Sequence, residues 1–440
     1  MDTTSTNGTN DVVLLRGATL ADLSPPRLRA ADVWIGGGVI IAVGDAPAGL
    51  RASTTIECSG CIALPGLVCG HGHLYSALAT GMPGPAVPPT CFVEILERVW
   101  WRLDVALDEP SLQASALVGA LGAVRSGTTA IIDHHASPSL IDGSLDVIAD
   151  ALEEVGLRGV LCYETTDRGG PGRRDAGLRE NERFLVAATS RRLARGLVGG
   201  HAGFTLSDES LAACVDIARR HGSGLHVHTA EDGADQRDSV EKHGLRVLER
   251  LSRAGALGPR TLLAHGVHLD ERERALLAGS ECWIAHNPRS NMNNSVGYAR
   301  PSSLGPRVVL GTDGIGADMI AESQHAFFRA REESLHTDAA TIVGWLARGA
   351  ELVSDLFGLP VGRLEPGAAA DITVLEPGSA TPITEGSLPW HWMFAFSSRQ
   401  VRDVLVGGRV VLRDREVVSV DEERVLALAR EEAPRLWARM

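Results

Sequence analysis

The sequence predicts an α/β protein: a (β/α)8 TIM barrel with a small composite β-sandwich domain formed by both chain ends. Three observations lead to this prediction. Eight short apolar runs lie between residues 64 and 314, helix-like segments separate them, and β-branched runs punctuated by glycine and proline flank them on both sides. The 440 residues, 44% of them hydrophobic and 22% charged, have ample material for a barrel and a smaller module.

The N-terminal part alternates β-branched runs with turn residues, at 12–20, 31–44 and 53–64, which is typical of a small antiparallel sheet. The same texture returns after a helical stretch at 339–357. It is found at 370–377, 400–414 and 415–420, before a further helix-like segment at 425–440. We therefore expect one β domain built from residues 1–64 and 365–440, including that last helix, beside a catalytic barrel of residues 65–364.

Each predicted barrel strand is an apolar run that ends in polar or ionisable residues. The eight runs are LPGLVCGHGH (64–73), TTAIIDHH (128–135), GVLCYETT (159–166), GLVGGHAGF (196–204), GLHVHTAED (224–232), TLLAHGVH (261–268), CWIAHNPRSN (282–291) and VVLGTDG (308–314). Segments between them, such as SLDVIADALEEVG, have helical periodicity and end in glycine, a helix stop signal. In a parallel barrel, the functional groups lie at the carboxyl ends of the strands.

Composition and charge disfavour several classes of function. A formal net charge of −13 disfavours nucleic acids and anionic membranes as partners, so a small molecule is the expected ligand. The only lysine, Lys242, lies in a polar helix-like segment, and no GxxxxGK[ST] motif is present, which disfavours Schiff-base and P-loop chemistry. The stretch MDTTSTNGTNDVVLL lacks a signal-peptide pattern, and the seven cysteines do not resemble a disulfide framework. A cytoplasmic location is therefore expected.

The strand ends supply a set of candidate metal ligands: His71, His73, His228, His265 and Asp313. Catalytic zinc sites use about three or four nitrogen or oxygen ligands and keep one position open for water. The His-x-His spacing at 71–73 does not by itself separate a metal site from a turn. The placement of the whole set at one end of one barrel does indicate a metal site. His228 is favoured over His226 because it lies one layer nearer the expected mouth.

Two carboxylates are candidates for proton transfer. Glu231 comes three residues after His228, just past the strand, where a proton shuttle to water belongs. Its alternative is a solvated loop acid. Asp313 lies in GTDG, whose glycines let the backbone bring a carboxylate close to a metal, so it could both ligate and accept a proton. His265 could orient the attacking water.

Several motifs, in this order, resemble the amidohydrolase superfamily, in its cytosine deaminase/chlorohydrolase-type (ATZ/TRZ-like) branch. They are HGH after PGL, HxHxxE at 226–231, AHGVHLD, HNPRSN and LGTDG. Longer stretches, among them WWRLDVALDE and GLRGVLCYETTDR, are similar to the SsnA-like aminohydrolases of that branch. The likeness extends over nearly the whole chain, because PGAAADITVLEPG resembles the family's composite β domain.

The resemblance implies one divalent metal per chain, zinc first and iron as the alternative, bound by His71, His73, His228 and Asp313. It also implies that Glu231 and His265 act on water and leaving group, that Asp313 helps to expel ammonia, and that His201 faces the substrate. The implied reaction replaces an amino group of a nitrogen heterocycle, such as an aminopurine or a pterin, by metal-activated water. One metal is favoured because GLVGGHAGF lacks the strand-4 lysine that bridges two metals in binuclear members.

Substrate selection is expected in the long segment after the first barrel strand and in HNPRSN, since loops of such length are usually functional. Glu94, Arg289 and Asn291 are expected to bind substrate together with His201. Trp100 and Trp101 could line the same pocket, although core packing is favoured for them. One of the histidines at 134–135 could contribute a further pocket group.

Two other functions stay open. The same metal site could hydrolyse a cyclic amide or displace another leaving group from a heterocycle. The barrel could also be a catalytically inactive scaffold, although every expected ligand and Glu231 are present. A homodimer that binds a small heterocyclic substrate, without nucleic acid or membrane partners, is expected.

Overall fold

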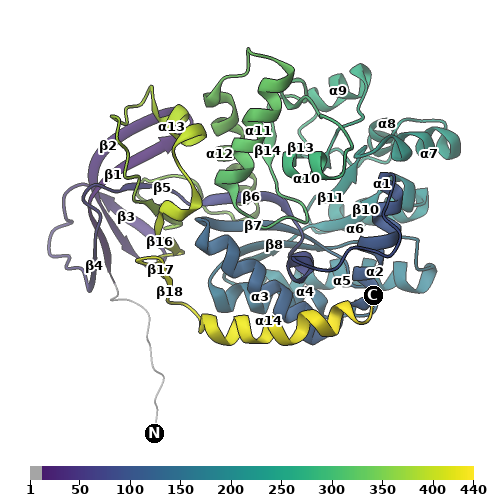
Figure 1. The fold of residues 1–440 in the computed structure, drawn as a ribbon, viewed down its shortest axis with the longest axis horizontal. Coiled ribbons are helices and arrows are strands. Elements are labelled where there is room, and N and C mark those ends of the chain that lie inside the picture. The colour runs from purple at the N-terminus through teal and green to yellow at the C-terminus, as the bar shows by residue number, and fades with distance from the viewer. Residues whose placement is uncertain (1–11) are drawn as a thin grey trace, which may run out of the picture.

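Eight short strands occupy the centre of the molecule where the sequence predicts them (Figure 1). The computed structural model describes residues 12–440, so the part of the predicted terminal domain and of the signal-peptide assessment that falls on residues 1–11 lies outside the described residues. The strands are β6 (Leu67–Gly72), β7 (Thr128–His135), β8 (Arg158–Tyr163), β9 (Ala194–Gly196) with β10 (Val198–Ala202), β11 (Leu225–Thr229), β12 (Leu262–His265), β13 (Trp283–His286) and β14 (Val308–Leu310). Nearly all of their residues are buried, which explains the near-continuous apolar runs.

The strands pair in parallel in two groups, β6–β9 and β10–β14. Isolated parallel bridges join the groups at both seams, between Gly72 and Asp313 and between Thr165 and Gly200. The run predicted as one fourth strand is divided into β9 and β10 at Leu197, whose amide still donates to the carbonyl of the neighbouring strand β8 at 3.0 Å. The predicted TIM barrel is confirmed, and all carboxyl strand ends meet at one mouth.

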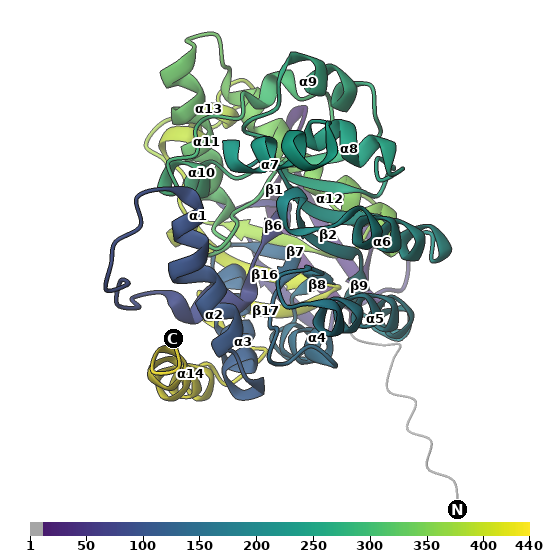
Figure 2. The ribbon, with the colours of Figure 1, turned by 90° about the vertical axis from the view of Figure 1, so that its right-hand side faces the viewer.

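Helices surround the strands, as Figure 2 shows from the side of the barrel. They are α1 (Phe92–Ile95), α2 (Trp101–Ala106), α3 (Glu109–Arg125), α4 (Ser144–Val155), α5 (Pro171–Ala187), α6 (Asp208–Arg220), α7 (Gly233–His243), α8 (Val247–Arg253), α9 (Glu271–Ala278), α10 (Pro288–Asn293), α11 (Met319–Glu333) and α12 (Ala339–Phe357). Local signals set their ends. Asp108 starts α3 with a reciprocal capping box, and Gly156 ends α4 in the left-handed region at φ 93°.

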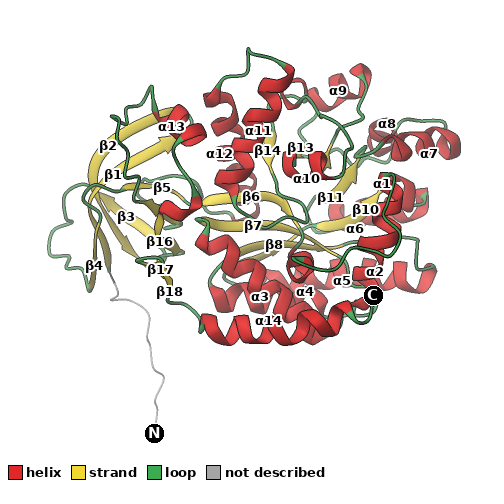
Figure 3. Cartoon of the chain, in the orientation of Figure 1, coloured by secondary structure: helices red, strands yellow, loops and turns green. Residues whose placement is uncertain are grey.

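The strands near both chain ends form one nine-stranded sheet beside the barrel (Figure 3). They are β1 (Val13–Leu23), β2 (Pro26–Gly36), β3 (Val39–Val43), β4 (Thr54–Glu57), β5 (Ile62–Pro65), β15 (Ile372–Leu375), β16 (Val401–Val406), β17 (Arg409–Arg413) and β18 (Glu416–Val417). The expected purely antiparallel pairing is wrong for β1, which pairs in parallel with β4 and β5. The connection from β1 to β4 passes through β2 and β3, so it exceeds the roughly dozen residues that a crossover between parallel neighbours requires.

The C-terminal helix α14 (Glu422–Trp437) lies along α3 of the barrel, at the bottom of Figure 1. The predicted β domain includes this helix, whereas its contacts are with the barrel side. Arg125 of α3 pairs with Glu422, and the indole nitrogen of Trp437 donates to the carbonyl of Leu78 at 2.8 Å. The boundaries at 64/65 and 364/365 stay a prediction. Among the described residues, no helix is long and apolar enough to cross a membrane.

A buried ion pair joins the barrel to the terminal sheet. The Arg158 guanidinium of β8 donates to both carboxylate oxygens of Asp371, at 2.8 and 2.9 Å, and both side chains are almost fully buried. The amide of Gly407 donates to the same carboxylate at 2.6 Å. Removing the carboxylate would therefore leave the Arg158 guanidinium and the Gly407 amide without this acceptor.

We expect Asp371→Ala to lower the free energy of unfolding by about 3–5 kcal/mol, because it leaves the buried Arg158 charge without a partner. Urea denaturation followed by circular dichroism measures this loss. Glu365→Ala is the matched control. Its partner Arg363 is exposed, so the change should stay within about 1 kcal/mol. An equal, small effect of both substitutions would contradict the prediction.

Candidate metal centre and active site

Two histidines at the end of β6 point at one carboxylate across the barrel seam. The Nε2 atoms of His71 and His73 lie 3.4 and 2.8 Å from Oδ1 of Asp313, which follows β14. The seam bridge between Gly72 and Asp313 holds the two strand ends side by side. The third histidine, His228 at the end of β11, brings its Nε2 to 3.3 Å from Nε2 of His73.

The opposite ring nitrogens of these histidines are engaged elsewhere. Nδ1 of His73 donates to the carbonyl of His134 at 2.5 Å, and Nδ1 of His228 donates to the carbonyl of His201 at 2.8 Å. Because a carbonyl only accepts, both rings carry their proton on Nδ1 in these bonds. Nδ1 of His71 lies 2.8 Å from Nε2 of His226. The second ring nitrogen is oriented in each case, as is usual for metal-bound histidine.

The convergent atoms fit a divalent cation. His71, His73, His228 and Asp313 each offer one ligand atom, and these atoms all lie within 4.8 Å of one another. Within residues 12–440, the fully buried Nε2 of His71 has no hydrogen-bond partner. Burial lowers the pKa of His71 to about 4 and holds that of His228 well below its usual range, so both imidazoles are neutral. Neutral imidazoles and one carboxylate are the donors that zinc and iron accept.

Asp313 reaches this position through a strained backbone. Its φ is +55°, in the left-handed region, and its side chain accepts a hydrogen bond from Ser290. The neighbouring strand approaches so closely that a Cβ on Gly311 would lie 2.8 Å from the backbone nitrogen of His71. The glycine expected to permit close approach is therefore required at 311.

Glu231 and His265 face each other next to the histidine cluster. Oε2 of Glu231 lies 3.5 Å from Nε2 of His265, and Oε1 accepts from the amide of Asn294 at 3.4 Å. Burial raises the pKa of the Glu231 carboxyl above its usual range. Nδ1 of His265 bonds Oδ1 of Asn291 at 2.8 Å, which leaves its buried Nε2 directed at Glu231 and Asp313. The two carboxylates predicted to transfer protons, Glu231 and Asp313, thus lie close to each other and to His265.

We expect His226→Leu to weaken metal binding by roughly 10–100-fold, the usual effect of removing a group that orients a metal ligand. His226 is fully buried behind His71 and outside the ligand set. Titration of the metal-depleted protein with zinc against a chromophoric chelator measures the change. His221→Gln, on an exposed residue, is the control. Unchanged affinity in His226→Leu would contradict the orienting role.

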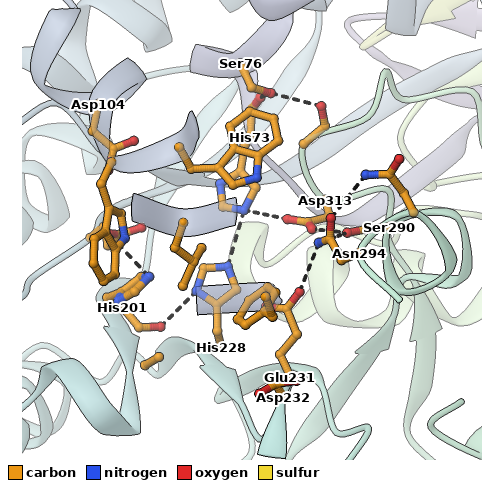
Figure 4. Close-up of a pocket in the computed structure, with 18 of the residues that line it drawn as sticks. His73, Ser76, Asp104, His201, His228, Glu231, Asp232, Ser290, Asn294 and Asp313 are labelled. Atoms are coloured by element: carbon orange, nitrogen blue, oxygen red, sulfur yellow. Dashed lines mark hydrogen bonds and ion pairs between the residues drawn. The ribbon is translucent and has the colours of Figure 1, made fainter. Parts of the chain in front are cut away.

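A cavity of about 800 Å³ opens over the cluster, and Figure 4 shows part of its wall. Of the residues predicted to bind substrate, His201 lines it, 3.9 Å from Glu164 through Nε2. Trp100 and Trp101 also line it, and both pack against the hydrophobic core, so the two roles considered for them coexist. Neither of the histidines at 134–135 does; both are fully buried beneath the mouth.

Three predicted substrate contacts lie away from this wall, and we do not include them in the site. Glu94 turns outward to bond Thr90 and Arg98. Arg289 is held by the buried Glu322, and its guanidinium also donates to a backbone carbonyl at 2.8 Å. Asn291 is buried, and its side-chain oxygen forms a hydrogen bond with His265. Each side chain has found a partner inside the protein.

Sequence reasoning missed two pairs of groups that line the cavity. Ser290 lies in α10 and Asn294 directly after it, and the first residues of this helix belong to the predicted HNPRSN run. Asp104 of α2 and Glu164, directly after β8, lie on the opposite side. Glu164 ends one of the eight predicted runs, so the strand-end rule could have found it. Asp104 had no comparable signal.

Comparisons with known proteins give a consistent picture. The model of the Amidohydrolase family matches residues 62–411. The chain is 30% identical to the 5-methylthioadenosine/S-adenosylhomocysteine deaminase of Pelotomaculum thermopropionicum, over 96% of this chain and 98% of that protein. It is 29% identical to the 5'-deoxyadenosine deaminase of Methanothermobacter thermautotrophicus, over 97% and 99%.

Solved structures share the fold at lower identity. A zinc-bound adenosine deaminase from Xanthomonas campestris superposes with a TM-score of 0.85 at 22% identity, over 98% of this chain and 99% of that one. The zinc complex of atrazine chlorohydrolase TrzN from Arthrobacter aurescens TC1 gives 0.82 at 22% identity, over 96% and 100%. At this identity the likeness concerns the fold alone.

Proposed function

Because the chain belongs to the amidohydrolase family, we propose that it is a metal-dependent aminohydrolase that replaces an amino group on a nitrogen heterocycle and releases ammonia. An aminopurine or a pterin is the expected ring. One observation carries the proposal: three imidazole nitrogens and the Asp313 carboxylate converge within 4.8 Å of one another at the floor of a cavity, with Glu231 and His265 beside them.

His71, His73, His228 and Asp313 would hold one divalent cation per chain, zinc first and iron as the alternative. A bound divalent cation lowers the pKa of water from its bulk value toward neutrality. The Nδ1 contacts of the three histidines, with His226 and with the backbone carbonyls of His134 and His201, keep the ligand rings in place. The strained backbone at Asp313 keeps its second oxygen on Ser290.

The remaining groups perform proton transfer. Glu231 is placed to take a proton from the attacking water and to pass it to the ring nitrogen next to the carbon under attack. His265 is placed to hold that water, since its free Nε2 faces both carboxylates. Asp313 is placed to take the remaining proton of the added hydroxyl and to give it to the departing nitrogen. As the carbon–nitrogen bond breaks, the carbonyl forms and the nitrogen leaves as ammonia. Each positioned transfer contributes about 10²–10⁴-fold in rate.

The cavity suits a flat heterocycle. Trp100, Trp101 and Phe204 supply aromatic walls, and His201 presents an imidazole between them and the cluster. Stacking on such walls would hold the ring while the polar floor acts on one of its edges.

The test is ammonia release by the zinc-loaded chain from a panel of aminopurines, pterins, aminopyrimidines and triazines, with metal analysis of the same preparation. Release from at least one ring, with close to one metal per chain, is expected. Silence across the panel together with opening of a cyclic amide would replace deamination by amide hydrolysis. A protein that cannot be loaded with metal would point to the inactive scaffold. The homodimer and the cytoplasmic location stay predictions.

A further inference from the structure

The wall of the cavity is acidic. Six carboxylates line it: Asp104, Glu164, Glu231, Asp232, Asp235 and Asp313. Among the described residues that line this cavity there is no lysine or arginine. A wall of this composition repels carboxylates and phosphates and attracts cations, because low-dielectric walls concentrate the field of like charges.

Four of the six carboxylates have other partners or tasks. Glu231 and Asp313 belong to the proposed reaction centre. Asp235 accepts from the backbone amides of Ala230 and Phe204 at 2.8 and 3.0 Å, and Asp232 caps the N-terminus of α7. Asp104 and Glu164 are left over.

Asp104 and Glu164 share a single guanidinium. Nη2 of Arg168 lies 2.7 Å from Glu164 and 3.5 Å from Asp104, and its guanidinium stacks over Trp101 at 4.5 Å. Two ionised carboxylates with one cation leave one negative charge without a counter-ion. Burial raises the pKa of both carboxyls, that of Asp104 to about 8, and a cation bound beside them would favour the ionised form again.

One acceptor of this pair has no partner. Asp104 is 2% exposed, and within residues 12–440 its Oδ1 makes no hydrogen bond. A buried, unpaired carboxylate oxygen costs free energy unless a ligand satisfies it. Four aromatic side chains line the same cavity as Asp104: Tyr75, Trp100, Trp101 and Phe204. Carboxylates among aromatic faces are the environment that organic cations prefer.

Asp104 lies apart from the reacting groups, whereas Glu164 comes within 4.8 Å of the ligand histidine His228. In Figure 4, Asp104 and His201 are on one side of His73 and His228, and Asp313, Ser290 and Asn294 are on the other. A ligand group at Asp104 would therefore belong to a substituent of the heterocycle, while the ring itself lies over the histidine cluster.

We infer that the substrate carries an organic cation, a protonated amine, amidine or guanidine, on a substituent that Asp104 and Glu164 bind. This inference rests on the proposed function, since it specifies the substrate of the same site. The pair contributes two acceptors, the bound cation favours the ionised form of Asp104, and the aromatic walls enclose the cationic group. The acidic wall of the cavity repels an anionic substituent.

The test uses three adenine derivatives that carry the same three-carbon chain on N9, ending in an amine, a hydroxyl or a carboxylate. Binding to the zinc-loaded full chain is followed through tryptophan fluorescence, because Trp100 and Trp101 line the cavity. Turnover is followed as ammonia. The amine should bind roughly tenfold or more tightly than the carboxylate, with the hydroxyl between them.

Two variants and a control separate charge from shape. Asp104→Asn and Glu164→Gln keep the side-chain outlines and remove one charge each, so each should reduce the preference for the amine by roughly tenfold. Glu97→Gln removes a charge from the same segment on an exposed residue outside the wall, and it should keep the full preference.

The outcomes distinguish this inference from the proposed function. Equal binding of amine and hydroxyl, or a carboxylate that binds as well as the amine, would overturn the cation assignment even if ammonia is released. A preference unchanged in both variants would overturn the role of Asp104 and Glu164. Cation-selective binding without ammonia from any derivative would support the subsite and count against deamination.

Discussion

Replacing Asp313 by asparagine should abolish turnover and weaken metal binding together. The carboxylate contacts both His71 and His73 through one oxygen and Ser290 through the other, so it is the single anion of the proposed ligand set. Asparagine keeps the shape but offers no charge to the cation and no base to the reaction. We expect kcat to fall by about 10³-fold or more, within the range that loss of proton transfer and ligation allows.

Metal content and ammonia release are measured on the same Asp313→Asn preparation. Asp338→Asn is the matched control, because Asp338 is exposed and caps α12, a role that asparagine also fills. The control should keep both metal and activity. An Asp313→Asn protein that binds metal normally and retains more than about a tenth of the rate would contradict both proposed roles of this residue.

Glu231→Gln should abolish turnover while the metal stays bound. Glu231 lies 3.5 Å from His265 and is no member of the four-residue ligand cluster, so its loss removes a proton carrier and spares the ligands. Glutamine retains the oxygen that accepts from Asn294. We expect kcat to fall by about 10²–10⁴-fold with an unchanged metal content.

The measurement pairs steady-state ammonia release with metal analysis and with binding of the heterocycle. Glu241→Gln, on the exposed face of α7, changes the same side chain where no reacting group is near. It should behave as the unsubstituted protein does. A near-normal rate in Glu231→Gln would exclude this carboxylate as the proton shuttle. Loss of metal in that variant would instead make it a ligand.

Three residues around the reaction centre share a backbone feature that only the structure shows. Ala230, His265 and Asp313 have φ angles of +49°, +76° and +55°, which non-glycine residues rarely adopt. Such conformations cost about 1–3 kcal/mol each and persist where the surrounding structure enforces them. Here the strain aims Glu231, His265 and Asp313 at one point.

The convergence of the candidate ligands was predictable because it follows from the spacing of the strands. The eight apolar runs correspond to strands at the predicted positions, and parallel strands in a barrel must bring their carboxyl ends to one mouth. His71, His73, His228 and Asp313 come directly at or after such ends, so their convergence did not depend on details of packing.

The cavity wall was predicted less well, for residues that lie outside strands. The sequence positions of Arg289 and Glu94 predict pocket residues. In the structure, however, Arg289 pairs with the buried Glu322, and Glu94 bonds Thr90 and Arg98. Asp104 reads as one acid in a helical stretch, and the rotation of α2 turns it into the cavity. A loop or helix residue can face several partners, and spacing does not select among them.

The sequence by itself determined the barrel, its eight strands and the residues at their carboxyl ends. The reason is that the carboxyl ends of parallel strands in a closed barrel must all lie at the same mouth. Only the tertiary structure decided which other side chains face the substrate. Asp104 and Glu164 are left with one guanidinium between them, whereas Glu94, Arg289 and Asn291 find partners inside the protein. Those outcomes depend on contacts between segments far apart in the chain, whose energies no local pattern records.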